Sequence, residues 1–242
     1  MIEIVSPDWP APERVQAFCT TRLGGVSSPP YDSLNLGRHV GDDVEQVDEN
    51  RRRLRAQLEL DSEPEWINQT HSARPVILEQ DQSRDADAAI TREPGRVAVV
   101  MTADCLPILL CNRDGSEVAA VHAGWRGLEA GIVQNTMADM LSSPGSLLAW
   151  IGPAISQANY EVGEEVFDAF RRVIDDAEAC FIPSRPGHWQ CDLGGLAERV
   201  LENAGVEAVS RSPNCSFGDS ERFFSYRREA VTGRMASLIW IR

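Results

Sequence analysis

Lysine is absent from this 242-residue sequence, in which all 23 of the Lys and Arg positions are arginine. The absence excludes Schiff-base chemistry, a pyridoxal-phosphate anchor, a P-loop lysine and a lysine general base. Recognition of a phosphate or carboxylate group would therefore depend on arginine, on backbone amides or on a metal ion.

Long apolar runs and targeting signals are missing as well. No stretch approaches the ~18 apolar residues of a membrane-spanning helix. Residues 1–20 have neither the cationic start nor the apolar core of a signal peptide. The six cysteines form no CxxC pair, so a disulfide framework is not expected. These absences predict a cytoplasmic protein.

Positive charge is in short supply. The formal net charge is -14 and the isoelectric point is about 4.7. A phosphate backbone needs a basic face, so we expect no nucleic-acid partner, and an acidic surface is not attracted to anionic membranes. The sequence does not indicate an oligomeric state.

The order of elements indicates one domain over residues 1–242, with no repeat and no long linker. Apolar spacing predicts helices over 44–60, 127–141, 160–174 and 193–205. A last pair of strands is expected within 222–242. Strands and helices are interspersed but hairpins occur, which favours an α+β fold of mixed β-sheets packed as a sandwich with flanking helices. No GxGxxG fingerprint supports a dinucleotide site.

A predicted hairpin at the centre of the chain carries the most chemical information. If its loop is Asn112–Gly115 and Cys111 pairs with Ser116, then Cys105 lies directly opposite His122. Opposite residues share a face, with Cβ atoms roughly 4.5–5.5 Å apart. Thiolate and imidazole bind zinc at about 2.3 and 2.0–2.1 Å, so such a pair could hold one ion.

Each residue around this pair also has a simpler interpretation. Cys105 alone would be a buried core cysteine, and His122 a core histidine with its hydrogen bonds satisfied. Asp104 is either an acceptor that fixes a histidine tautomer or a turn former. Gly124 allows the backbone to come close to a ligand, and we assign it to substrate binding.

At this point the sequence resembles the bacterial YfiH-like family. The segments TADCLPILLC and VHAGWRGLEAGI match the hallmark of that family. Further matches run along nearly the whole chain in order: TTRLGGVS, SLNLG, VGDD, ENRRRL, NQTHS, DADAAIT, YEVGEEV and FFSYRREAVTGRMA. The family is described variously as polyphenol oxidase (laccase domain), purine nucleoside phosphorylase and peptidoglycan editing factor.

The resemblance implies a metal site made by His71, Cys105 and His122. It adds His71 as the third ligand, which spacing alone does not distinguish from His39 and His188. In this family the segment before Tyr160 often carries cysteines, whereas this chain has GPAISQANYEVG. An essential cysteine is therefore not expected there.

Three protein ligands leave one open position, the pattern of a catalytic zinc. A bound water with its pKa lowered to about 7 would suit attack on C6 of adenosine, and Asp104, Glu161 and Glu164 are candidate proton carriers. The resemblance also implies a small-molecule substrate, because the family is credited with phosphorolysis of purine nucleosides by phosphate. Arg126, just before a predicted helix, and Arg22, in a glycine-rich segment, are the candidates for gripping phosphate.

Two other enzyme classes remain open. Copper is the second choice of metal, but a four-copper oxidase needs on the order of ten histidines and the chain has four, so the oxidase ranks below nucleoside chemistry. Alternatively Cys105 and His122 form a nucleophilic pair without metal. That pair would make a hydrolase or amidase acting on a peptidoglycan precursor. A non-catalytic binding protein is disfavoured by the Cys and His cluster.

Overall fold

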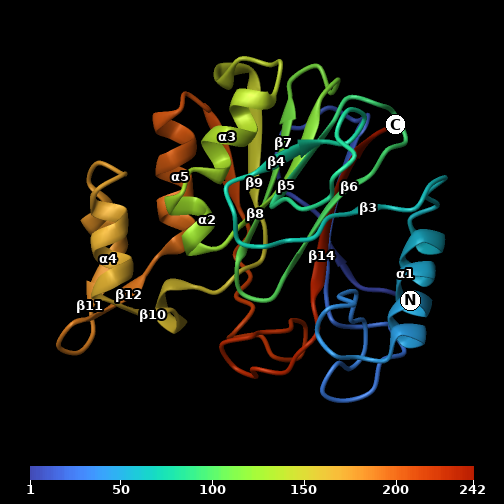
Figure 1. Ribbon diagram of the computed structural model, residues 1–242, viewed down its shortest axis with the longest axis horizontal. Helices are drawn as coiled ribbons and strands as arrows, with labels where there is room; N and C mark the ends of the chain where they lie inside the picture. Colours follow the sequence, from blue (N-terminus) through green and yellow to red (C-terminus); the bar gives the residue numbers. More distant parts are fainter.

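Two large β-sheets face each other in the computed structural model, which describes residues 1–242 (Figure 1). The five-stranded sheet has the order β1 (Ile4–Val5), β2 (Val15–Thr20), β14 (Met235–Ile241), β6 (Ala98–Thr102), β3 (Glu65–Trp66). The six-stranded sheet has the order β13 (Ala208–Arg211), β9 (Leu147–Ile151), β7 (Leu106–Asn112), β8 (Val118–Ala123), β5 (Ala88–Thr91), β4 (Pro75–Ile77). A smaller sheet contains β10 (Glu161–Gly163), β12 (His188–Cys191) and β11 (Phe181–Pro183).

Strand β7 explains why the centre of the sequence is apolar without alternation. All of its residues are buried. Leu109 and Cys111 belong to the core between the two large sheets, whereas Ile108 and Leu110 belong to the core under the helices. Because both faces of the strand are covered, both sets of side chains are apolar. Burying each large side chain contributes roughly 1.5–3 kcal/mol.

The helices cover the outer faces of the two sheets (Figure 1). The outer face of the six-stranded sheet packs against α2 (Trp125–Glu129), α3 (Ile132–Asp139) and α5 (Leu193–Asn203). Helix α1 (Val44–Gln57) covers the five-stranded sheet through Leu54. Helix α4 (Glu164–Arg171) packs beside the small sheet. Short 3-10 turns occupy Pro144–Ser146, Gln157–Asn159 and Ala177–Cys180. The expected α+β class with packed mixed sheets and flanking helices is confirmed.

Several predicted elements differ in detail. The helix expected over 127–141 is two helices, because Gly131 adopts a φ of 91° between α2 and α3. The segment 160–174 begins as strand β10 before α4 starts. Only one strand, β14, forms within 222–242, where a pair was expected. The helix expected over 193–205 is confirmed, and Gly205 follows its end with a φ of 96°.

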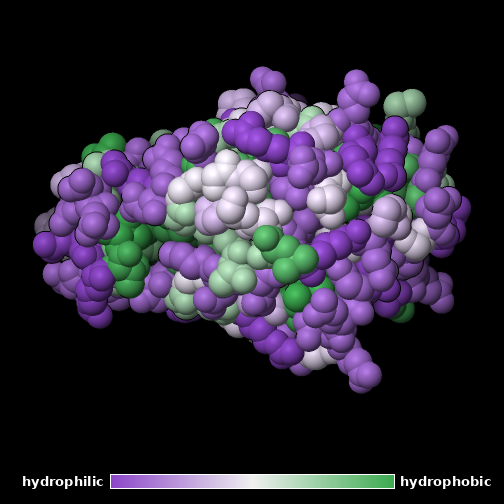
Figure 2. All heavy atoms as spheres, turned by 90° about the horizontal axis from the view of Figure 1, so that it is seen from above, coloured by the Kyte–Doolittle hydropathy of each residue, from purple (hydrophilic) through white to green (hydrophobic).

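The surface of the protein is mostly polar, as expected from its acidic composition. Figure 2 shows one face that is mostly hydrophilic, interrupted by small apolar patches. None of the helices combines the length and the apolar character needed to cross a membrane.

The turn between β7 and β8 corrects the predicted hairpin register. Leu106 pairs with Ala123 and Cys111 with Val118, two residues away from the expected pairing. The Asn112 side chain accepts hydrogen bonds from the backbone N–H groups of Ser116 and Glu117, so Asn112 closes the strand and does not belong to the loop. A shift of two residues keeps every side chain on its face. Cys105 therefore still shares a face with His122, although the two are not directly opposite.

Replacement of Asn112 tests this account of the turn. Asn112→Ala leaves the N–H groups of Ser116 and Glu117 without their acceptor, so we expect the free energy of unfolding to fall by about 1–3 kcal/mol in urea denaturation. Asn112→Asp keeps an acceptor for these N–H groups, so its free energy of unfolding should fall less. The exposed neighbour provides the control, because Arg113→Ala should change stability by no more than about 0.5 kcal/mol. An unchanged urea midpoint for Asn112→Ala would contradict the role of this side chain.

Candidate metal centre

His122 is held in a defined orientation by Asp87. The histidine lies in β8 and is buried, and its Nδ1 is 2.8 Å from Oδ1 of the fully buried Asp87. The backbone N–H of His122 also donates to the carbonyl of Asp87, at 2.7 Å. An ionised carboxylate can only accept, so Nδ1 carries the proton and Nε2 is left to bind a ligand.

The same carboxylate fastens the loop that carries His71. The backbone N–H groups of Thr70, His71 and Ser72 donate to it at 3.2, 3.0 and 2.6 Å. The Ser72 hydroxyl adds a bond of 2.7 Å. These bonds hold His71 in a left-handed conformation with a φ of 60°. Burial would raise the pKa of Asp87, but the hydrogen bonds from His122 and Ser72 lower it to about 2.

Cys105 follows a sharp bend at Asp104, whose φ is 93°. The Asp104 carboxylate accepts hydrogen bonds from the Ser216 hydroxyl at 2.6 Å, the Ser225 hydroxyl at 3.0 Å and the Arg227 backbone at 2.7 Å. Asp104 therefore anchors a turn to the C-terminal segment. The histidine-fixing role considered for it belongs to Asp87, which the sequence analysis did not single out.

Gly124 makes room for two of the predicted ligands. It follows β8 at the position facing Cys105 in the extended register. A Cβ at this position would lie 2.9 Å from Sγ of Cys105 and 3.2 Å from Cδ2 of His71. Any larger residue would push the thiol or the imidazole away.

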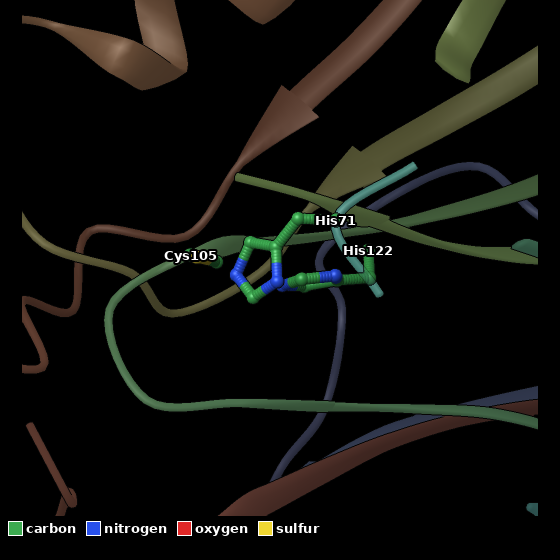
Figure 3. Close-up of side chains that lie close together, drawn as sticks. All are labelled: His71, Cys105 and His122. Atoms are coloured by element: carbon green, nitrogen blue, oxygen red, sulfur yellow. The ribbon is translucent and has the colours of Figure 1, made fainter. Parts of the chain in front are cut away.

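The structure brings His71, Cys105 and His122 together (Figure 3). Their candidate ligand atoms all lie within 4.8 Å of one another, and the imidazole rings meet edge to face at 82°. Tetrahedral zinc bonds of about 2.0–2.3 Å place ligand atoms roughly 3.5 Å apart, so small side-chain movements would suffice. The donor set and its spacing fit one transition-metal ion.

The charges of the cluster favour the ligand form of the cysteine. Burial would raise the pKa of the Cys105 thiol, but the charge of His122 and hydrogen bonds from both histidines outweigh burial and lower it. Burial would lower the pKa of His122, whereas the Cys105 thiolate and Asp87 raise it. Metal binding needs the thiolate and displaces the imidazole proton at Nε2.

The cluster opens into a cavity of about 410 Å³, within the size range of small-molecule sites. Besides the three ligands it is lined by His39, Gln69, Met101, Thr102, Ala103, Tyr226 and Arg234. Sequence reasoning assigned no role to His39 or Arg234. Arg234 belongs to the segment FFSYRREAVTGRMA that matches the family, and His39 lies between the matching segments SLNLG and VGDD, but nothing local marks either as a site residue.

The two arginines proposed from sequence lie elsewhere. Arg22 is buried and donates to the carbonyls of Asp32 and Ser220, so it joins an N-terminal loop to the C-terminal segment. Arg126 is exposed, with its guanidinium 4.3 Å from the centre of the Trp125 ring. Neither lines the cavity. Glu161 and Glu164 do not line the cavity either. The Glu161 carboxylate accepts hydrogen bonds from the side chains of Ser184 and Arg185.

Replacing Asp87 should affect stability and metal affinity together. The amide in Asp87→Asn cannot accept all of these hydrogen bonds, so we expect a loss of roughly 3 kcal/mol or more in the free energy of unfolding. Zinc affinity should fall about 10–100-fold, because the orientation of both histidines depends on this group. Urea denaturation and competitive zinc titration measure the two effects. The exposed Asp85→Asn is the matched control, and equal behaviour of the two variants would contradict the assignment.

The lowered pKa of Cys105 predicts its reactivity in metal-free protein. The thiolate persists in the folded state below the ordinary thiol pKa of about 8.5, so alkylation by iodoacetamide should continue at lower pH than in the unfolded chain. Peptide mass spectrometry separates Cys105 from Cys215, the other cysteine that is not buried. One equivalent of zinc should block the reaction at Cys105. If the pH midpoint for alkylation of Cys105 is the same in folded and unfolded protein, the prediction is refuted.

Comparisons with known proteins agree with this architecture. The chain is 49% identical over 243 residues to "Purine nucleoside phosphorylase YfiH" of Escherichia coli, covering 100% of both sequences. It is 51% identical over 241 residues to a purine nucleoside phosphorylase of Pseudomonas aeruginosa, covering 98% of both. The crystal structure of protein NMB0706 from Neisseria meningitidis superposes with a TM-score of 0.93 at 45% identity, covering 98% of each chain.

The family match extends over most of the sequence. Residues 16–242 fit the family model described as "Multi-copper polyphenol oxidoreductase laccase". The crystal structure of YlmD from Geobacillus stearothermophilus also superposes, with a TM-score of 0.91 at 31% identity, covering 99% of this chain and 96% of that one. The chain therefore belongs to the multi-copper polyphenol oxidoreductase laccase family, the YfiH-like family that its motifs indicate.

Proposed function

We propose that this protein is a zinc-dependent purine nucleoside enzyme. It would cleave adenosine, inosine and methylthioadenosine with phosphate, and also deaminate adenosine. The observation that carries the proposal is the cluster of His71, Cys105 and His122 in the wall of a cavity large enough for a nucleoside. The relatives named purine nucleoside phosphorylase support this choice of substrate.

The donor set favours zinc over copper as the resident ion. One thiolate and two imidazoles with an open fourth position are typical of catalytic zinc. When bound, the ion supplies Lewis acidity and a water whose pKa is lowered to about 7. The contribution of the chain is orientation: Asp87 fixes the ring of His122 and the backbone of His71, and Gly124 leaves space for Cys105.

Phosphorolysis joins an oxygen of phosphate to C1′ of the sugar while the C1′–N9 bond breaks. The electron pair leaves with N9, and the proton of the attacking P–OH group passes to the base, which gives the free base and the 1-phosphate of the sugar (ribose 1-phosphate from adenosine or inosine). Deamination exchanges the 6-amino group of adenosine for the oxygen of water, which gives inosine and ammonia. In both reactions the cavity holds the two reactants together, and this proximity is itself a large part of catalysis.

A second candidate rests on the same side chains without a metal. Cys105, His122 and Asp87 form a connected thiol, imidazole and carboxylate series, the arrangement of nucleophilic hydrolases. Such a series could cleave an amide bond in a peptidoglycan precursor. It differs from the first proposal because it predicts activity in metal-free protein that alkylation of Cys105 abolishes.

Incubation of purified protein with adenosine, with and without phosphate, tests the proposed function. Free base and ribose 1-phosphate that form only with phosphate identify phosphorolysis, and inosine formed without phosphate identifies deamination. We expect about one zinc per chain by metal analysis. His71→Ala should lose the zinc and lower kcat/KM by roughly 100-fold or more.

His188→Ala is the matched control, because His188 lies on β12 outside the cavity. It should keep both zinc and activity. Copper in place of zinc with oxidation of phenols, or full nucleoside activity in metal-free protein, would overturn the proposal. Cleavage of a muropeptide precursor by metal-free protein would establish the second candidate.

A further inference from the structure

Arg234 is the one arginine among the residues that line the cavity of the metal-ligand cluster. It follows Gly233 in the GRMA segment, directly before β14, and is partly buried. Its Nη1 donates to the carbonyls of Thr232 and Gly233, at 3.1 and 3.0 Å. Its Nε and Nη2 make no hydrogen bond to the protein and it forms no ion pair. These two atoms form the edge of the guanidinium that binds two oxygens of an anion side by side.

The backbone of Arg234 is fixed by a distant part of the chain. Its N–H donates to Oδ1 of the fully buried Asn35 at 3.0 Å, and its carbonyl accepts from Leu36 at 3.2 Å. Gly37 completes the support, because a Cβ there would lie 2.9 Å from Cγ of Arg234. The side chain thus passes over a glycine to reach the cavity. A cation held in this way loses little conformational freedom when it binds a ligand.

A second residue of the cavity wall has a buried polar group without a partner. Thr102, at the end of β6, is 2% exposed, and its hydroxyl forms no hydrogen bond within the protein. A buried hydroxyl without a partner is unfavourable and is uncommon in native proteins. Thr102 pairs with Met235 across the sheet, next to Arg234 in sequence. The free donor of Thr102 and the free edge of Arg234 are therefore contributed by neighbouring strands.

The rest of the chain offers no better cation for this cavity. Lysine is absent, Arg22 is occupied by the carbonyls of Asp32 and Ser220, and Arg126 is exposed on α2 outside the lining. The chain carries a formal net charge of -14, so an anion enters against the overall charge and needs a local cation. Arg234 supplies that cation beside the metal-ligand cluster.

We propose that Arg234 and Thr102 form the binding site for the phosphate co-substrate, with the guanidinium edge holding two phosphate oxygens and the hydroxyl donating to a third. This inference rests on the proposed phosphorolysis. It places phosphate in the same cavity as the three metal ligands, beside the position where the nucleoside must bind for C1′ to be attacked.

Phosphate binding can be measured without turnover, by isothermal titration calorimetry of zinc-loaded protein with inorganic phosphate. In Arg234→Gln we expect the Kd for phosphate to rise roughly 100-fold, because two charge-assisted hydrogen bonds are lost. In Thr102→Val the Kd should rise roughly 5-fold, with thermal stability unchanged or higher, because the lost hydroxyl has no partner in the free protein. The KM for phosphate should follow the Kd, while the KM for nucleoside and the zinc content stay unchanged.

Arg113→Gln, on the exposed hairpin turn, is the control that removes one positive charge far from the cavity. It should bind phosphate as the parent does. If Arg234→Gln does not fold, Thr102→Val still tests the site. Unchanged phosphate affinity in either folded variant, loss of affinity in Arg126→Gln instead, or no phosphate binding by the parent would overturn the inference. Phosphate binding that depends on Arg234 in a protein without nucleoside cleavage would keep the site and refute the function.

Discussion

The buried carboxylate of Asp87 is the group on which the geometry of the candidate metal centre depends. It accepts a hydrogen bond from the ring of His122 and three from the backbone around His71. Asp87 lies directly before β5, and β5 pairs with β8, so the sheet itself places the carboxylate beside the histidine. One ionised group thereby orients His122, which lies in a strand, and His71, which lies in a loop. A movement of the carboxylate would therefore displace both histidines.

The site forms where the chain crosses from one sheet to the other. Strand β6 belongs to the five-stranded sheet and β7 to the six-stranded sheet, and the short link between them carries Asp104 and Cys105. The three candidate metal ligands therefore gather at the end of the six-stranded sheet, while Thr102 comes from the five-stranded sheet and Arg234 directly precedes its strand β14. Both sheets contribute to one cavity. One wall therefore carries the thiol and the imidazoles, and the other carries the positive charge of Arg234.

The sequence predicts the features that depend on local periodicity, and misses those that depend on distant pairing. The shared face of Cys105 and His122 was predicted because a two-residue error in register leaves the faces unchanged. His71 came only from the resemblance to a family. Asp87 could not be distinguished from Asp85 in DADAAIT, because only the pairing of β5 with β8 decides which carboxylate is buried. Arg234 depends on Asn35, which lies far away in the chain.

The position of β14 has a consequence for how the protein acquires its activity during synthesis. This strand follows every other in sequence, yet it lies inside its sheet between β2 and β6, and Arg234 directly precedes it. The three candidate metal ligands lie between residues 71 and 122, whereas the guanidinium of Arg234 leaves the ribosome near the end of translation. Contacts between such distant segments form slowly and late in folding. Asp104, which directly precedes Cys105, is anchored by Ser216, Ser225 and Arg227. Both walls of the cavity therefore await the last part of the chain, and the site is completed only when synthesis ends.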